Sequence, residues 1–228
     1  MRLDLPKRAL VVLAHPEPQS FNAALARAAI STLENNGWSV AFTDLNVTSF
    51  DPVSDRRNFQ NSKPTSQVLR LQTEERIAAE TGTFIPILAQ EQDKLLNANL
   101  VIWQFPLWWG GMPAIMKGWI DRVLASGVAY GGGRKFDTGV LNGRYGLLSL
   151  TTGGAAETFN AQGFGDMDQV LHPIRRCILE FVGLITLRTQ VVHQPEMLLD
   201  HQRTAEIELW KDRLSRIESE FAQHGVED

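Results

Sequence analysis

The stretch that decides the fold class reads ALVVLAHPEPQSFN, residues 9–22. Its first six residues are all apolar, which is typical of a strand buried on both faces of a parallel sheet. Pro16 and Pro18 then keep the chain out of a helix. Ser20 or Asn22 can cap a following helix through residues 23–33, with Gly37 as its stop signal. A strand, a loop and a helix in this order predict an α/β unit.

The same alternation recurs along the rest of the chain. Further strands are expected at 38–45, 100–105, 145–150 and 184–192, and further helices at 86–97, 113–124, 166–181 and 207–221. Residues 46–85 are mostly polar, and we expect short helices there, around 66–80. The pattern predicts one doubly wound α/β domain over 1–228, with an irregular insertion at about 46–85. Its strand order is 2-1-3-4-5, with helices on both faces.

Composition excludes several classes of function. The 228 residues carry a net charge of −4 without a basic run, so no nucleic-acid partner is expected. Cys177 is the one cysteine, which excludes an intrachain disulfide, and the cysteine and histidine spacing predicts no metal site. Its apolar helical surroundings predict a buried, inert thiol. No signal peptide or membrane span is recognisable, so we expect a cytoplasmic protein.

The predicted order places a crevice at the carboxyl ends of the first and third strands, because connections leave there in opposite directions, and three loops should converge at this crevice. The loop at 15–22 offers helix N-terminal amides, the Ser20 hydroxyl and the Asn22 amide, which suit a phosphate or pyrophosphate. Ordinary N-capping by Ser20 or Asn22 explains the same residues. His15 could donate to a phosphate or hold the turn.

The other two loops indicate a planar ligand. Trp108 and Trp109 follow a buried strand and cannot both point into one core, so at least one should face the crevice or a partner subunit. Gly153 and Gly154 offer unobstructed backbone amides that can hold negative charge, although a plain turn uses the same residues. A nucleotide-tethered planar cofactor such as a flavin fits all three loops.

These stretches resemble the NAD(P)H:quinone oxidoreductase (DT-diaphorase-like) family. The matching segments are 9–22, 100–122 (LVIWQFPLWWGGMPAIMKGWIDR) and 148–154 (LSLTTGG), followed by 163–174 and the final helix. The resemblance implies a flavodoxin-like fold and FAD, with FMN less favoured. It also implies NAD(P)H as co-substrate and a homodimer with the flavin at the subunit interface.

The resemblance assigns roles to individual residues. Trp109 would lie at the flavin ring, Thr151 to Gly154 at its pyrimidine edge, and Glu196 and Arg203 nearer the adenine, although Arg203 could also be a solvated charge. Trp109, Tyr130 and Phe164 would contact the substrate. The full set expected at the cofactor is His15, Ser20, Phe21, Asn22, Ala23, Pro106, Leu107, Trp108, Trp109, Gly110, Thr151, Thr152, Gly153, Gly154, Phe159, Glu196 and Arg203.

The sequence departs from the family pattern at the expected catalytic position. Phe159 stands where the family has a tyrosine, and residues 162–166 are one residue short and lack the family's histidine. Gly110 and Gly132 replace bulky aromatic residues, which predicts a roomier substrate site. We therefore expect the amides of Gly153 and Gly154 to bear more of the charge on the reduced flavin.

The expected activity is ping-pong transfer of a hydride from NAD(P)H through FAD to a quinone. Two alternatives stay open on the same residues. The acceptor could be an azo dye, a nitroaromatic or a free flavin, since the site is predicted to be roomier. The chain could instead be a regulatory flavoprotein subunit of a potassium efflux system, because the catalytic tyrosine and histidine of the family are missing.

Overall fold

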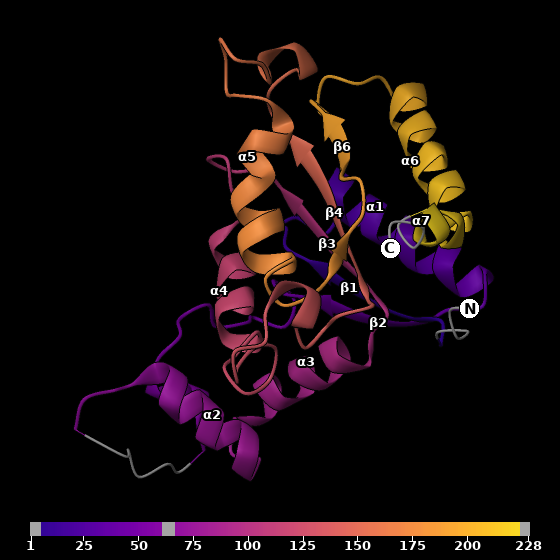
Figure 1. Ribbon diagram of the computed structural model, residues 1–228. Coiled ribbons are helices and arrows are strands. Elements are labelled where there is room, and N and C mark those ends of the chain that lie inside the picture. The colour runs from indigo at the N-terminus through magenta and orange to yellow at the C-terminus, as the bar shows by residue number, and fades with distance from the viewer. Residues whose placement is uncertain (1–5, 61–66, 224–228) are drawn as a thin grey trace.

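The computed structural model describes residues 6–60 and 67–223. In this part of the chain a parallel sheet has the order β2-β1-β3-β4-β5, and β6 also pairs with β4 (Figure 1). The expected order 2-1-3-4-5 is confirmed. The strands are β1 (Arg8–Leu13), β2 (Ser39–Asp44), β3 (Leu100–Pro106), β4 (Tyr145–Thr152), β5 (Ile185–Thr186) and β6 (Gln190–His193).

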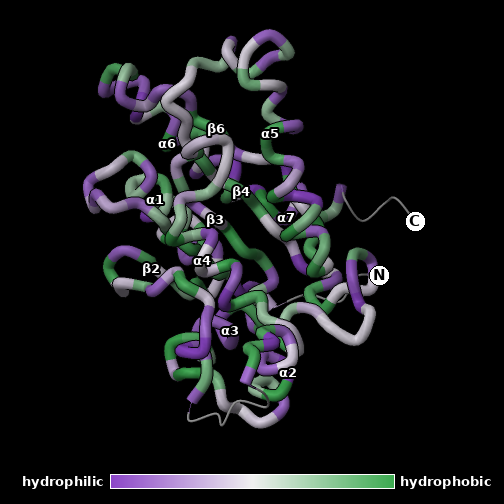
Figure 2. The backbone as a smooth tube through the Cα atoms, turned by 90° about the vertical axis from the view of Figure 1, so that its left-hand side faces the viewer, coloured by the Kyte–Doolittle hydropathy of each residue, from purple (hydrophilic) through white to green (hydrophobic). Residues whose placement is uncertain are grey.

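Helices cover both faces of the sheet (Figure 1). On one face α1 (Phe21–Asn35), α6 (Asp200–Ser215) and α7 (Ile217–Gln223) share one apolar core. On the other, α3 (Pro86–Asn97), α4 (Ala114–Val123) and α5 (Met167–Ile174) share a second. Every residue of β3 and β4 is buried between the two layers, and Figure 2 shows β4 as a hydrophobic stretch inside the molecule. The expected doubly wound fold is confirmed.

Local signals set several helix ends. Ser20 caps α1 by accepting a hydrogen bond from the Ala23 N–H, and Gly37, just past the helix, has a positive φ of 82°. The predicted helix at 86–97 is confirmed residue for residue, with Pro86 in its first turn, where the missing N–H costs nothing.

The fifth strand differs from the sequence prediction, which had one strand over 184–192. Gly146 and Ser149 of β4 are three residues apart, whereas their partners Thr186 and Gln190 are four apart. One extra residue therefore bulges out, and the strand is split into β5 and β6. The predicted closing helix also breaks, at Arg216, and α7 carries Phe221 onto the ring of Tyr145 at a centroid distance of 3.9 Å.

The prediction for Cys177 is wrong, because this thiol is exposed. Pro173 has no N–H for the helical ladder, and after it α5 widens into a π-helical turn, η4 (Arg175–Leu179). In this turn Leu179 faces the core while Cys177 faces solvent. The apolar residues around Cys177 in the sequence therefore did not predict that its side chain faces solvent.

The segment 46–85 contains η1 (Arg56–Asn58) and α2 (Leu71–Thr81), so helices are present where the sequence predicted them; the first residue of the predicted range, Ser66, lies outside the described residues. In Figure 1 α2 projects away from the sheet. Two further short 3-10 turns are η2 (Phe136–Thr138) and η3 (Ala156–Thr158).

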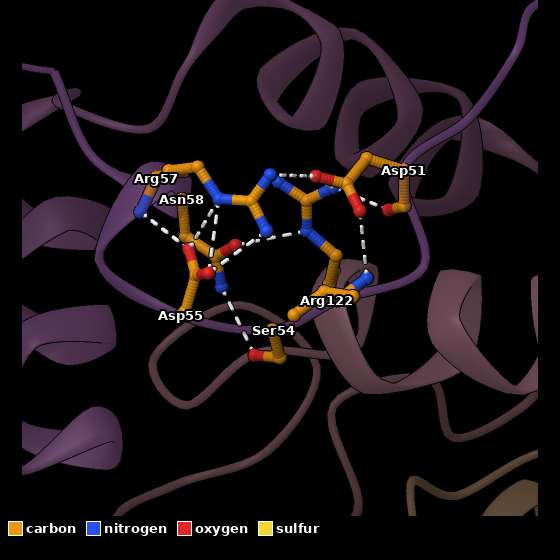
Figure 3. A network of polar contacts seen from close by, with 7 residues as sticks. Asp51, Ser54, Asp55, Arg57, Asn58 and Arg122 are labelled. Atoms are coloured by element: carbon orange, nitrogen blue, oxygen red, sulfur yellow. Dashed lines mark hydrogen bonds and ion pairs between the residues drawn. The ribbon is translucent and has the colours of Figure 1, made fainter.

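A buried arginine of α4 anchors the segment 46–85 to that helix (Figure 3). Arg122 is 2% exposed, and its Nε donates to Asn58 Oδ1 at 2.8 Å while its Nη1 donates to the Asp51 carbonyl. Burial lowers the pKa of Arg122, and the neighbouring Asp51 opposes that shift. Gly118 lets the segment approach closely, since a Cβ there would lie 2.3 Å from Pro52 Cα.

Candidate active site

A cleft of about 800 Å³ opens at the carboxyl ends of β1, β3 and β4. This volume lies within the usual range of roughly 300–1,000 Å³ for small-molecule and cofactor sites. Its walls come from the three predicted loops and from the segment after β6. The expected residues that line it are His15, Ser20, Phe21, Asn22, Pro106, Leu107, Trp108, Trp109, Thr151, Thr152, Gly153, Glu196 and Arg203.

The N-terminus of α1 supplies donors to the cleft. Ser20 Oγ is occupied as the cap, at 3.1 Å from the Ala23 N–H. Among the described residues, the backbone N–H groups of Phe21 and Asn22 donate to nothing. His15 Nδ1 accepts the Glu17 N–H at 3.0 Å, so the neutral ring carries its proton on Nε2. His15 thus holds the turn with one nitrogen and keeps the other as a donor.

The Asn22 side chain is used inside the protein. It is 3% exposed, donates to Thr151 Oγ1 at 2.8 Å and accepts from Gln104 Nε2 at 2.8 Å. A buried amide needs such partners, so the expectation that this side chain faces an anion gives way to a structural role. Asn22 joins α1 to β3 and β4 beneath the cleft.

The tryptophan loop is a tight turn. Trp108 and Gly111 exchange backbone hydrogen bonds of 3.0 and 2.9 Å, while Trp109 and Gly110 have φ values of +54° and +70°. Two positive φ angles define a type I′ turn, which is unfavourable for a side chain as large as tryptophan. Trp108 is 47% exposed and Trp109 fully so, as expected for a pair that cannot share one core.

The glycine turn after β4 carries the second set of donors. Among the described residues, the N–H groups of Gly153 and Gly154 have no partner. Gly153 lines the cleft, whereas Gly154 packs under the following loop: a Cβ there would lie 3.3 Å from Phe159 and 3.4 Å from Phe164. Phe159 therefore supports the turn from behind and does not line the cleft.

Other expected residues also lie outside the cleft wall. Ala23 contributes its N–H to the cap of α1, and Gly110 sits at the outer end of the tryptophan turn. Phe164 is exposed, and Tyr130 packs against Phe181 at a centroid distance of 5.9 Å. Burial raises the pKa of Tyr130. One chain by itself does not bring Tyr130 or Phe164 to the cleft wall.

Four residues that line the cleft were missed by the sequence reasoning. Gln194, Pro195 and Met197 lie in the segment after β6, and Glu17 lies in the first loop. The first three follow a parallel strand, so the rule that ligands bind beyond strand carboxyl ends could have found them. Arg203 shapes this segment by donating to the Leu198 carbonyl and pairing with Asp200. Glu196 and Arg203 both line the cleft.

The described residues contain no group of three or more histidine, cysteine, aspartate or glutamate side chains placed to hold a metal ion. None of the described helices is long and apolar enough to cross a membrane.

Sequence comparison decides the family. The pattern of the family described as flavodoxin-like fold matches residues 7–214. NAD(P)H dehydrogenase [quinone] 1 from Rattus norvegicus is 40% identical over 212 residues, covering 92% of this chain and 77% of that protein. The chain belongs to the flavodoxin-like family whose pattern it matches. Human ribosyldihydronicotinamide dehydrogenase [quinone] is 35% identical, with 92% of each chain covered.

A solved structure agrees with this assignment. A protein from Klebsiella pneumoniae, described as a candidate quinone reductase, superposes with a TM-score of 0.87 at 34% identity, covering 92% of this chain and 85% of that one. The resemblance inferred from the sequence motifs is therefore confirmed across most of the chain.

Proposed function

We propose that this protein is an FAD-dependent NAD(P)H:quinone oxidoreductase. The observation that carries the proposal is one cleft in a chain of this family. The cleft combines helix N-terminal amides that have no partner among the described residues, an exposed tryptophan turn and a glycine turn. Helix N-terminal amides suit a pyrophosphate, aromatic faces suit a planar ring, and amides of a turn suit the oxygen-rich edge of that ring. The donor set of the cleft therefore fits a flavin dinucleotide.

Each part of the cleft has a separate task. His15 Nε2 and the amides of Phe21 and Asn22 would hold the phosphates, and Trp109 with the chain from Pro106 to Gly110 would lie along the ring. The amides of Gly153 and Gly154 would stabilise negative charge on its pyrimidine edge. Glu196 and Arg203 would lie at the adenine end, where the cleft extends past β6. When bound, the flavin supplies the redox chemistry by accepting and passing on a hydride.

FAD is favoured over FMN because the cleft continues from α1 to the segment after β6, which gives room for an adenine half. We also propose a homodimer, since Trp109 and Phe164 expose large apolar surfaces near the cleft and Tyr130 and Phe164 lie outside the wall that one chain builds. A second subunit would complete the substrate site. A cytoplasmic location stays a prediction.

The test is the absorption spectrum of the purified protein, followed by release and chromatography of its chromophore. We expect a flavin spectrum and FAD. Steady-state assays with NADH, NADPH and dihydronicotinamide riboside should then show reduction of a benzoquinone faster than of an azo dye or a nitroaromatic. A colourless protein that does not bind added FAD would refute the proposal.

A further inference from the structure

His193 lies directly behind the glycine turn of the cleft. It is the last residue of β6, and its Nδ1 lies 2.9 Å from Thr152 Oγ1 and 3.3 Å from the Gly154 carbonyl. Its ring packs against Phe159 at a centroid distance of 5.4 Å. His193 does not line the cleft, but Gly153 and Gln194 on either side of these contacts do.

The contacts among Thr152 Oγ1, His193 Nδ1 and the Gly154 carbonyl determine which of these atoms carry a proton. The Thr152 hydroxyl donates to the Gly154 carbonyl at 2.7 Å, which uses the one proton that this hydroxyl has. The Gly154 carbonyl can only accept. All three contacts are hydrogen bonds only if His193 carries a proton on Nδ1 and donates it to Thr152 Oγ1 and the Gly154 carbonyl. Any other arrangement leaves two acceptors facing each other.

This donor ties the turn to two strands at once. Thr152 is the last residue of β4, and the Gln194 N–H also donates to its carbonyl, at 2.7 Å. The bonds occupy the carbonyl of Gly154 while the N–H groups of Gly153 and Gly154 have no partner among the described residues. Because the carbonyls of Thr152 and Gly154 hold the turn in place, the N–H groups of Gly153 and Gly154 stay available to a ligand.

We propose that His193 is a positioning residue: its Nδ1–H holds the turn from Thr152 to Gly154 so that the turn's amides can bind the flavin's pyrimidine edge. The inference rests on the proposed function and adds to it a residue outside the cleft wall. Because the amides should stabilise reduced flavin more than oxidised flavin, His193 influences both FAD affinity and the flavin's reduction potential.

Two variants separate the hydrogen bond from the packing. His193→Asn places an amide N–H at the same number of bonds from Cα as Nδ1, whereas His193→Phe keeps a ring against Phe159 but has no donor. We expect H193N to bind FAD within about twofold of wild type. H193F should bind it roughly three- to tenfold more weakly, the effect of one hydrogen bond.

The reduction potential is the decisive measurement. In H193F the affinity for reduced FAD should fall about tenfold more than that for oxidised FAD, which is a shift of about 30 mV to more negative potential. H193N should keep the wild-type potential. In addition, ¹⁵N NMR of the histidine-labelled protein with FAD bound should show His193 protonated on Nδ1.

The outcomes distinguish this inference from the proposed function. If H193F loses thermal stability but keeps the wild-type FAD affinity and potential, His193 is only structural and the inference is wrong. A His193 ring protonated on Nε2 alone would also overturn it. A wild-type protein that binds no FAD would overturn the proposed function, and this inference with it.

Discussion

Replacing Trp109 separates backbone strain from cofactor binding. The residue has a φ of +54°, and its side chain is fully exposed, so it contributes no burial to the free protein. A left-handed conformation costs an L-residue about 1–2 kcal/mol, whereas glycine adopts it freely. Glycine also makes the unfolded chain more flexible, which offsets about 0.4–1 kcal/mol. Trp109→Gly should therefore stabilise the FAD-free protein by about 0.8 kcal/mol.

Trp109→Ala is the matched control. Alanine keeps the Cβ and hence the strain, so W109A should stay within about 0.5 kcal/mol of wild type. Both variants lose the ring that we expect to stack on the flavin, and both should bind FAD more weakly by about 1–3 kcal/mol, as for stacking of a base on an aromatic side chain.

Urea unfolding of the FAD-free proteins measures the first effect through the midpoint at constant m-value, and fluorescence titration with FAD measures the second. The order of stability should be W109G above W109A. If W109G is the less stable of the two, the turn is not strained as argued. If both variants bind FAD as tightly as wild type, Trp109 does not contact the flavin.

Two further predictions concern the segment that packs on α4 and on the loop after it. Gly118→Ala should cost about 1–3 kcal/mol in thermal unfolding, because its Cβ would lie 2.3 Å from Pro52 and overpack the contact; an unchanged melting temperature would contradict this close approach. Burial raises the pKa of Glu75 above its ordinary 4.5, with a hydrogen bond from the Ser126 N–H opposing the shift. At pH values between the two pKa values, Glu75 is protonated in the folded protein and ionised in the unfolded chain. The contribution of Glu75 to the free energy of unfolding therefore falls as pH rises from about 4.5 through the raised pKa of the folded state. Glu75→Gln should remove that loss, and its melting temperature relative to wild type should rise between pH 4.5 and 8; a constant difference would show that Glu75 does not titrate in this way.

The fold could be predicted from local signals because strands buried on both faces are mostly apolar, and because helix ends carry their own caps and glycines. Residues 100–106 and 145–152 illustrate the first, and Ser20 with Gly37 the second. The split of the fifth strand could not be predicted, since it depends on a one-residue mismatch in register against β4. The exposed thiol of Cys177 depends in the same way on the π-helical turn after Pro173.

The sequence by itself determined the doubly wound sheet, its strand order and the three loops that build the cleft, because these follow from periodicity, turn residues and motifs close together in the chain. Only the tertiary structure decided which side chains in those loops remain free. The Asn22 side chain donates a hydrogen bond to Thr151, which is 129 residues away in sequence, and His193 contacts Thr152, which is 41 residues away. Such pairs depend on how parallel strands align and where each strand ends, and neither is encoded within any one segment.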